Sequence, residues 1–188
     1  MNTVEHIVEC YFRIFRRCFT MHDVKVERGN NRQFDLLAVS LLDGAQYHVE
    51  SSVTHCERWC PTTDDLIKIF DRKFFGVPTE RDGERTDFRR GRSYEREIFD
   101  AYRTVGLEPT DIQRVFCCWV LPEEPELDST LQRYSESKAI RPIQVLSFRD
   151  EVLPRLEESV ATANYEDEAL RTLSLLRQRE LQSRSHTA

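Results

Sequence analysis

The part of the sequence that decides the fold begins with Arg32-Gln33-Phe34-Asp35-Leu36-Leu37-Ala38-Val39-Ser40. After the turn Asp43-Gly44 it continues with Tyr47-His48-Val49-Glu50-Ser51-Ser52-Val53. An Asp-Gly pair between two runs rich in apolar and β-branched residues is a strong signal for a β-hairpin. The sequence therefore predicts two antiparallel strands, near 33–42 and 46–54, and the other elements are arranged around them.

Each strand of this hairpin carries one acid among residues that otherwise look buried, Asp35 in the first strand and Glu50 in the second. A carboxylate inside a core strand is costly unless it is paired or binds a metal ion. An ordinary hydrogen-bonding role is the alternative for either acid taken alone. Because two acids on adjacent strands can share one cation, we interpret the pair as a candidate metal site.

The length of 188 residues suits one domain with a helical tail, and we predict a domain over 1–162 and a C-terminal helix with a disordered end over 163–188. The net charge of -6 gives no overall attraction to nucleic acid, so such binding needs a local basic patch. There is neither an apolar run of the roughly 20 residues that cross a bilayer nor a secretion signal. A cytoplasmic location with reduced cysteines is expected.

The apolar pattern before the hairpin predicts a helix over 3–19, and alternation predicts an edge strand over 22–27. After the hairpin, a helix opens at Pro61 and ends at Gly76. The later elements are a helix over 93–105, a central strand over 112–121, a helix over 127–138, a strand over 143–146, a helix that ends near 161 and a last helix over 165–181. This order predicts a three-layer α/β/α fold with a mixed central sheet of about five strands.

A leading helix with an acid, followed by this hairpin, resembles the PD-(D/E)xK, or restriction-endonuclease-like, nuclease superfamily. The matching elements are Glu5-x-x-Val8-x-x-Tyr11-Phe12, Phe34-Asp35-Leu36-Leu37-Ala38 and His48-Val49-Glu50-Ser51-Ser52. The resemblance implies a restriction-endonuclease-like fold and hydrolysis of phosphodiester bonds in nucleic acid, with DNA the expected partner. It also implies that Asp35 and Glu50 bind Mg²⁺ or Mn²⁺ and that Glu5 completes the coordination shell of the ion. Glu9 is the alternative third acid.

The sequence departs from the family where the family has its lysine, because Ser52 occupies that position, on the same face as Glu50. A hydroxyl can orient a water molecule, but it supplies no positive charge. Lys73 on the following helix is our preferred substitute, ahead of Lys68, and a plain surface lysine is the alternative. We therefore expect a catalytic set of Asp35, Glu50, Ser52 and Lys73, or else a nuclease fold that has lost its chemistry and serves as a nucleic-acid-binding or protein-interaction module.

A polar stretch over 79–92 is expected to form a mobile surface loop, and its arginines are candidate phosphate contacts. These arginines are Arg81, Arg85, Arg89, Arg90 and Arg92. Nearby acids almost balance their charge, so a solvated mixed-charge loop is the alternative.

Trp59 and Phe88 are candidates for stacking on bases, and His48 and His55 are further candidate site residues. A third interpretation is a zinc-stabilised interaction protein that uses His55, Cys56 and Cys60, although the C-x3-C spacing has no second matching pair. The last helix is also a candidate contact with a second copy of the chain.

Overall fold

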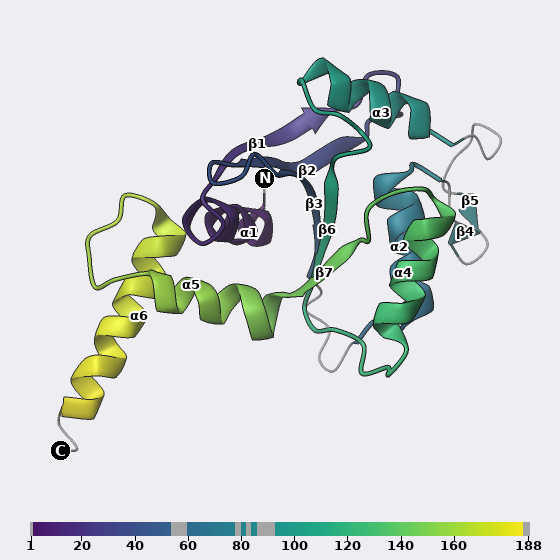
Figure 1. Ribbon diagram of the computed structural model, residues 1–188. Coiled ribbons are helices and arrows are strands. Elements are labelled where there is room, and N and C mark those ends of the chain that lie inside the picture. The colour runs from purple at the N-terminus through teal and green to yellow at the C-terminus, as the bar shows by residue number, and fades with distance from the viewer. Residues whose placement is uncertain (1, 54–59, 78–79, 82–83, 86–92, 186–188) are drawn as a thin grey trace.

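A five-stranded sheet with helices on both faces forms the centre of the structure, a computed structural model that describes residues 2–53, 60–77, 80–81, 84–85 and 93–185 (Figure 1). The strands are β1 (Cys18–Lys25), β2 (Gln33–Ser40), β3 (Gln46–Ser52), β6 (Gln113–Cys118) and β7 (Gln144–Ser147), and they lie in the order β1-β2-β3-β6-β7. Neighbours from β1 to β3 are antiparallel, whereas β3, β6 and β7 are parallel. The predicted mixed sheet is confirmed, with the predicted edge strand at one edge and β6 in the interior.

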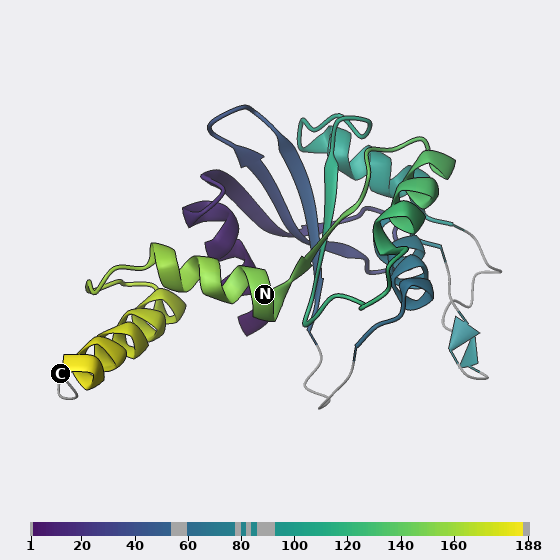
Figure 2. The same cartoon turned by 60° about the horizontal axis from the view of Figure 1, so that its bottom comes forward.

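Helices form the two outer layers, and the last helix extends away from them, as Figures 1 and 2 show. They are α1 (Thr3–Ile14), α2 (Thr63–Phe74), α3 (Glu95–Thr104), α4 (Leu127–Ser137), the π-helix η1 (Phe148–Val152), α5 (Leu153–Ser159) and α6 (Glu168–Ser185). On one face, α1 and α5 contribute Phe12 and Leu156 to a core cluster that also contains Leu36. On the other face, α2 and α4 pack against β6, and α3 packs against β2. The three-layer α/β/α fold is therefore confirmed.

The first helix is shorter than predicted, because α1 ends at Ile14 and β1 begins at Cys18. Phe15 and Phe19 extended the apolar pattern in the sequence, but they are 39% and 72% exposed, so they are not part of the buried helix face. Arg17 has a φ of 56°, in the left-handed region, and turns the chain between the two elements. The prediction of helix over 15–19 was wrong.

Part of the polar stretch predicted as a loop forms two short strands. β4 (Glu80–Arg81) and β5 (Glu84–Arg85) pair in an antiparallel manner, so the loop prediction was wrong for these residues. Arg89, Arg90 and Arg92, together with Phe88, lie outside the described residues, as do His55, Cys56 and Trp59.

The last helix begins at Glu168, three residues later than predicted, because the Asp167 carboxylate accepts hydrogen bonds from the backbone N–H groups of Ala169 and Leu170. Leu170 packs into the core, and the rest of α6 extends away from the sheet (Figure 2). None of the helices in the described ranges has both the length and the apolar character that crossing a membrane requires.

Candidate functional site

Asp35 and Glu50 lie side by side on the hairpin. Leu36 pairs with Val49, Asp35 directly precedes Leu36, and Glu50 directly follows Val49. The Asp35 backbone N–H donates to Glu50 Oε1 at 3.4 Å, and the Ser51 N–H donates to Asp35 Oδ2 at 2.9 Å. Glu50 is fully buried, and the Asp35 side chain is 11% exposed. The strand register thus brings the two predicted acids together and fixes them through backbone bonds.

Lys73 provides the positive charge between these acids. Its Nζ lies 2.6 Å from Glu50 Oε2 and 3.4 Å from Asp35 Oδ2. The capping box at the start of α2 and the buried Phe70 and Phe74 position the last turn of that helix, which carries Lys73, against the sheet. Of the two lysines considered from the sequence, the structure places Lys73 at the acids, while Lys68 is exposed on α2 and Ser52 is exposed at the end of β3.

The two carboxyl groups differ in protonation. Burial and the neighbouring charge of Glu50 raise the pKa of Asp35 to about 7, against the opposing effect of Lys73. Burial alone would raise the pKa of Glu50, but the hydrogen bond from His48 and the charge of Lys73 outweigh it, so this pKa is lowered. Both acids in turn raise the pKa of Lys73 despite its burial. Near neutral pH, an ion pair of Lys73 and Glu50 therefore lies beside a partly protonated Asp35.

The third acid proposed from the sequence lies on α1. Glu5 accepts hydrogen bonds from the Asn2 backbone N–H and from Asn2 Nδ2, and its charge contributes to the raised pKa of Asp35. Glu9 instead accepts from the Thr20 hydroxyl at 2.7 Å and lies 3.5 Å from His6 Nδ1. The contacts described for Glu5 cap α1 and those of Glu9 lie at Thr20 and His6, so the charge of Glu5, the smallest cause of the raised pKa of Asp35, is what connects the third acid with the hairpin.

His48 connects Glu50 to a buried tyrosine on α3. Its Nε2 lies 2.8 Å from Glu50 Oε1, and its Nδ1 lies 2.6 Å from Tyr102 Oη. Burial lowers the pKa of His48, so the ring is neutral, and an ionised Glu50 can only accept a hydrogen bond. We therefore assign the ring proton to Nε2, with the Tyr102 hydroxyl donating to Nδ1. The sequence indicated that His48 shares a face with Glu50, but it gave no sign of Tyr102.

Arg114 on β6 completes this buried group. It pairs with His48 in the parallel register, is fully buried, and places its guanidinium 5.5 to 5.9 Å from the ring centres of Phe75, Phe99 and Tyr102. This residue was not among those predicted from the sequence. A single arginine inside the apolar run 112–121 was the signal that could have identified it, because a charge within a central strand needs partners.

A cavity of about 290 Å³ adjoins the acid and lysine side chains, with Asp35, Lys73, Arg32 and Arg72 among the residues that line it. Arg32 Nη1 donates to the Arg72 carbonyl at 2.8 Å, and the Arg32 guanidinium lies 5.3 Å from the ring centre of Tyr94. Three cationic side chains around one carboxyl make a suitable environment for a phosphate group. The sequence pointed to the arginines of 79–92 for this role, and Arg32 was missed.

Of the cysteines in the predicted zinc half-site, Cys60 lies within the described residues. It is exposed, and its thiol donates to the Leu121 carbonyl at 3.3 Å.

The chain matches no family model, and neither its sequence nor its fold gave a significant match to a curated protein or a solved structure. The function of the chain therefore has to be inferred from the geometry of the site.

Replacing Asp35 with asparagine is expected to stabilise the metal-free protein at neutral and alkaline pH. The folded-state pKa of about 7 lies above the ordinary value of 3.8, so the contribution of Asp35 to stability falls as pH rises between these values. The amide introduced by Asp35→Asn resembles the protonated acid and avoids that loss, which we expect to be about 4 kcal/mol near pH 8. Urea unfolding in the presence of a chelator, at about pH 5 and pH 8, measures the difference. An Asp35→Asn variant that is less stable than wild type at the higher pH would contradict the assigned protonation.

Proposed function

We propose that the chain is a Mg²⁺-dependent nuclease that hydrolyses phosphodiester bonds in nucleic acid, with DNA the expected substrate. The observation that supports the proposal best is the arrangement of Asp35 and Glu50 around Lys73, next to a cavity with two arginines. Such a combination of carboxylates and cations is suited to a metal ion on one side and a phosphate on the other. It also agrees with the resemblance to the PD-(D/E)xK superfamily, in which a lysine accompanies the two acids.

The donor set fits Mg²⁺ or Mn²⁺. Asp35 and Glu50 offer hard carboxylate oxygens from adjacent strands, and Glu5 lies close enough to influence Asp35 electrostatically. Burial first, and then the charge of Glu50, raise the pKa of Asp35, and a bound cation would favour the ionised form of this acid. Mg²⁺ bound by these residues would supply a water molecule of lowered pKa and neutralise charge on the phosphodiester.

The protein groups then have separate roles. Asp35 and Glu50 would hold the cation, and His48 keeps Glu50 ionised and oriented through the bond to Oε1. Lys73 stabilises negative charge that develops on the phosphate and stands in for the lysine that Ser52 replaces. Arg32 and Arg72 line the cavity and would contact a phosphate bound there.

Cleavage assays test this proposal directly. We expect the full-length protein to cleave at least one substrate among single-stranded, duplex and branched DNA and RNA in Mg²⁺ or Mn²⁺, but none in a chelator. Glu50→Ala and Asp35→Ala should each lower the rate by more than about 10³-fold, since each removes a metal ligand. Activity that survives both substitutions would refute the mechanism.

A binding module is the second candidate function. In the described structure Glu50 Oε1 has a hydrogen bond with His48 and Oε2 forms an ion pair with Lys73, so the charge of this acid is balanced without a metal ion. Two results would support this module. The wild type would cleave no substrate in Mg²⁺ or Mn²⁺, and Asp35→Ala would bind DNA with the same affinity as the wild type. Calorimetric titration with Mn²⁺ adds a further distinction, because the nuclease proposal requires binding to wild type and its loss in Asp35→Ala.

The predicted contact between two copies through the last helix also stays a proposal. Leu175, Leu176 and Leu181 are exposed on α6, which makes this helix the natural surface for such a contact. Sedimentation of the wild type and of a Leu175→Glu/Leu181→Glu variant distinguishes a dimer from a monomer.

A further inference from the structure

Three side chains with different metal-binding groups meet where α6 begins, against α1. His6 Nε2 lies 3.0 Å from Asp167 Oδ2, Cys10 Sγ lies 3.7 Å from the same oxygen, and the sulfur and nitrogen are 4.0 Å apart. His6 and Cys10 are one helical turn apart on α1, so they share a face. Within the described residues, this is a group of three candidate ligands whose atoms lie close enough to hold one ion.

The distances agree with a tetrahedral zinc site. Zinc bonds to sulfur, nitrogen and oxygen of about 2.0–2.3 Å place neighbouring ligand atoms about 3.3–3.6 Å apart. The three measured separations, 3.0, 3.7 and 4.0 Å, lie on either side of this range. Small side-chain movements would therefore form three corners of a tetrahedron, with the fourth corner left for water or another ligand.

Asp167 and His6 each have further neighbours beside this cluster. Asp167 uses Oδ1 to cap α6 through the N–H groups of Ala169 and Leu170, which leaves Oδ2 for His6 and Cys10. The other ring nitrogen of His6, Nδ1, lies 3.5 Å from Glu9 Oε2, and Thr20 holds the second oxygen of that acid. A carboxylate behind a ligating histidine is the usual arrangement in metal sites.

We propose that His6, Cys10 and Asp167 bind Zn²⁺ and that the ion fixes the start of α6 to α1. A thiolate, an imidazole and a carboxylate together select zinc over Mg²⁺, which favours oxygen ligands. Cys10 is buried, while the His6 and Asp167 side chains are partly exposed and leave a path for the ion. This site is separate from the acids of the hairpin and does not depend on the proposed nuclease function.

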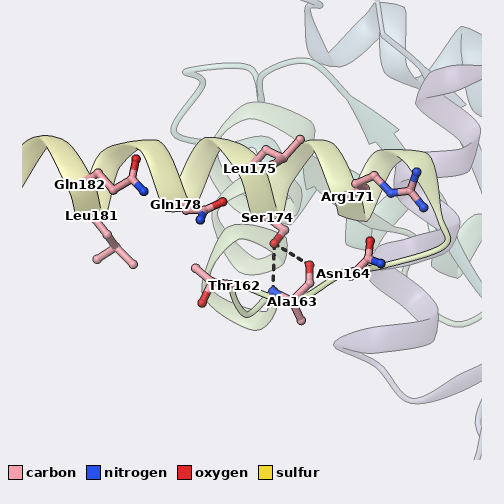
Figure 3. Close-up of a pocket in the computed structure, with 9 residues that line it drawn as sticks. All are labelled: Thr162, Ala163, Asn164, Arg171, Ser174, Leu175, Gln178, Leu181 and Gln182. Atoms are coloured by element: carbon pink, nitrogen blue, oxygen red, sulfur yellow. Dashed lines mark hydrogen bonds between the residues drawn. The ribbon is translucent and has the colours of Figure 1, made fainter.

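The effect of zinc is expected in the first half of α6, which already has several contacts with the preceding segment. Ser174 Oγ donates to the Ala163 carbonyl at 2.9 Å and accepts from its N–H at 3.1 Å, as the dashed lines in Figure 3 show. Arg177 Nη1 also donates to the Val160 carbonyl at 2.7 Å. A metal link at Asp167 adds a cross-connection to α1 at the point where these contacts begin.

Titration with Co²⁺, a spectroscopic substitute for zinc, tests the site in the full-length protein after removal of metal. We expect one equivalent to give a thiolate-to-cobalt charge-transfer band and visible bands of a tetrahedral site, both lost on addition of Zn²⁺. Cys10→Ser should weaken binding more than about 100-fold, because even loss of an outer hydrogen-bond partner costs about 10–100-fold. Cys18→Ser is the matched control, since Cys18 is also buried and its thiol contacts only the Arg16 carbonyl among the contacts described.

A double variant distinguishes this cluster from the cysteines predicted as a zinc half-site. The Cys56→Ser/Cys60→Ser variant should keep the cobalt spectrum if the ion lies at Cys10. Loss of the spectrum in that variant, or its persistence in Cys10→Ser, would overturn the proposal.

Hydrogen exchange tests the structural effect. We expect Zn²⁺ to slow amide exchange in the first turns of α6 in wild type and not in Asp167→Asn, which retains an oxygen to cap the helix. Equal protection by zinc in both proteins would show that the ion binds elsewhere. Zinc binding without any added protection of α6 in wild type would overturn the assigned role.

Discussion

Replacing Lys73 with methionine is expected to slow nucleic-acid cleavage by about 10²–10³-fold, the usual cost of removing one preorganised charge-stabilising group. Lys73 is the cation that touches both acids, at 2.6 Å from Glu50 and 3.4 Å from Asp35. Methionine keeps the length and apolar contacts of the side chain while it removes the charge. Single-turnover cleavage rates in saturating Mg²⁺ measure the effect on the chemical step.

The matched control is Lys68→Met on the same helix, where the lysine is exposed. We expect its rate to stay within about twofold of wild type, since exposed substitutions away from the site are close to neutral. Because Lys73→Met also leaves Glu50 without its ion-pair partner, Lys73→Arg serves as a variant that keeps the charge and the fold. A folded Lys73→Met protein with wild-type cleavage would show that another group supplies the charge.

The second large effect is expected on stability, for His48→Phe. Phenylalanine preserves a ring among Phe34, Phe74 and Tyr102, but it removes the 2.8 Å hydrogen bond to buried Glu50 Oε1 and the 2.6 Å hydrogen bond with the Tyr102 hydroxyl. Each lost partner of a buried polar group costs about 1–3 kcal/mol, more for a charged one, so we expect about 3–5 kcal/mol in total. Chemical denaturation at neutral pH measures the free energy of unfolding.

His22→Phe is the control for this substitution, because His22 lies on β1 with its side chain 46% exposed. We expect a change within about 0.5 kcal/mol for that variant. The His48→Phe protein should also lose the contribution of His48 to the pH dependence, which lowers stability below about pH 6.5 because a buried neutral histidine disfavours the folded state there. A loss of less than about 1 kcal/mol, with an unchanged pH dependence, would contradict the assigned hydrogen-bond chain.

The hairpin was predictable because its signals are local. Alternating apolar residues and the Asp43-Gly44 turn determine both the strand positions and the register, and the register brings Asp35 to Glu50. Lys73 was preferred over Lys68 from its position in the sequence alone, and the buried Phe70 and Phe74 of α2 explain why it lies at the acids. The end of α1 was not predictable from the same pattern, because Phe15 and Phe19 are apolar yet exposed.

The inner partners of the site were missed for a different reason. Tyr102 lies 54 residues after His48, and nothing in either local segment shows that α3 places its tyrosine over β3. Arg114 becomes meaningful only when β6 pairs with β3 and the rings of Phe75 and Phe99 surround it. Contacts of this kind depend on tertiary packing, which amino-acid periodicity does not encode.

β3 is antiparallel to one neighbour and parallel to the other, and this has a consequence for the order in which the chain folds. Asp35 and Glu50 are 15 residues apart, whereas the Tyr102 contact spans 54, so the hairpin closes a much shorter loop. We expect Gly44→Ala, at a φ of 72°, to slow folding, and Tyr102→Phe mainly to speed unfolding. Stopped-flow chevron plots distinguish the two, and a Tyr102→Phe variant that slows folding as much as Gly44→Ala would reverse the order. The acids would then be paired before the histidine, tyrosine and arginine close around them, so the carboxylates of the site are set in place first and their supporting groups arrive last.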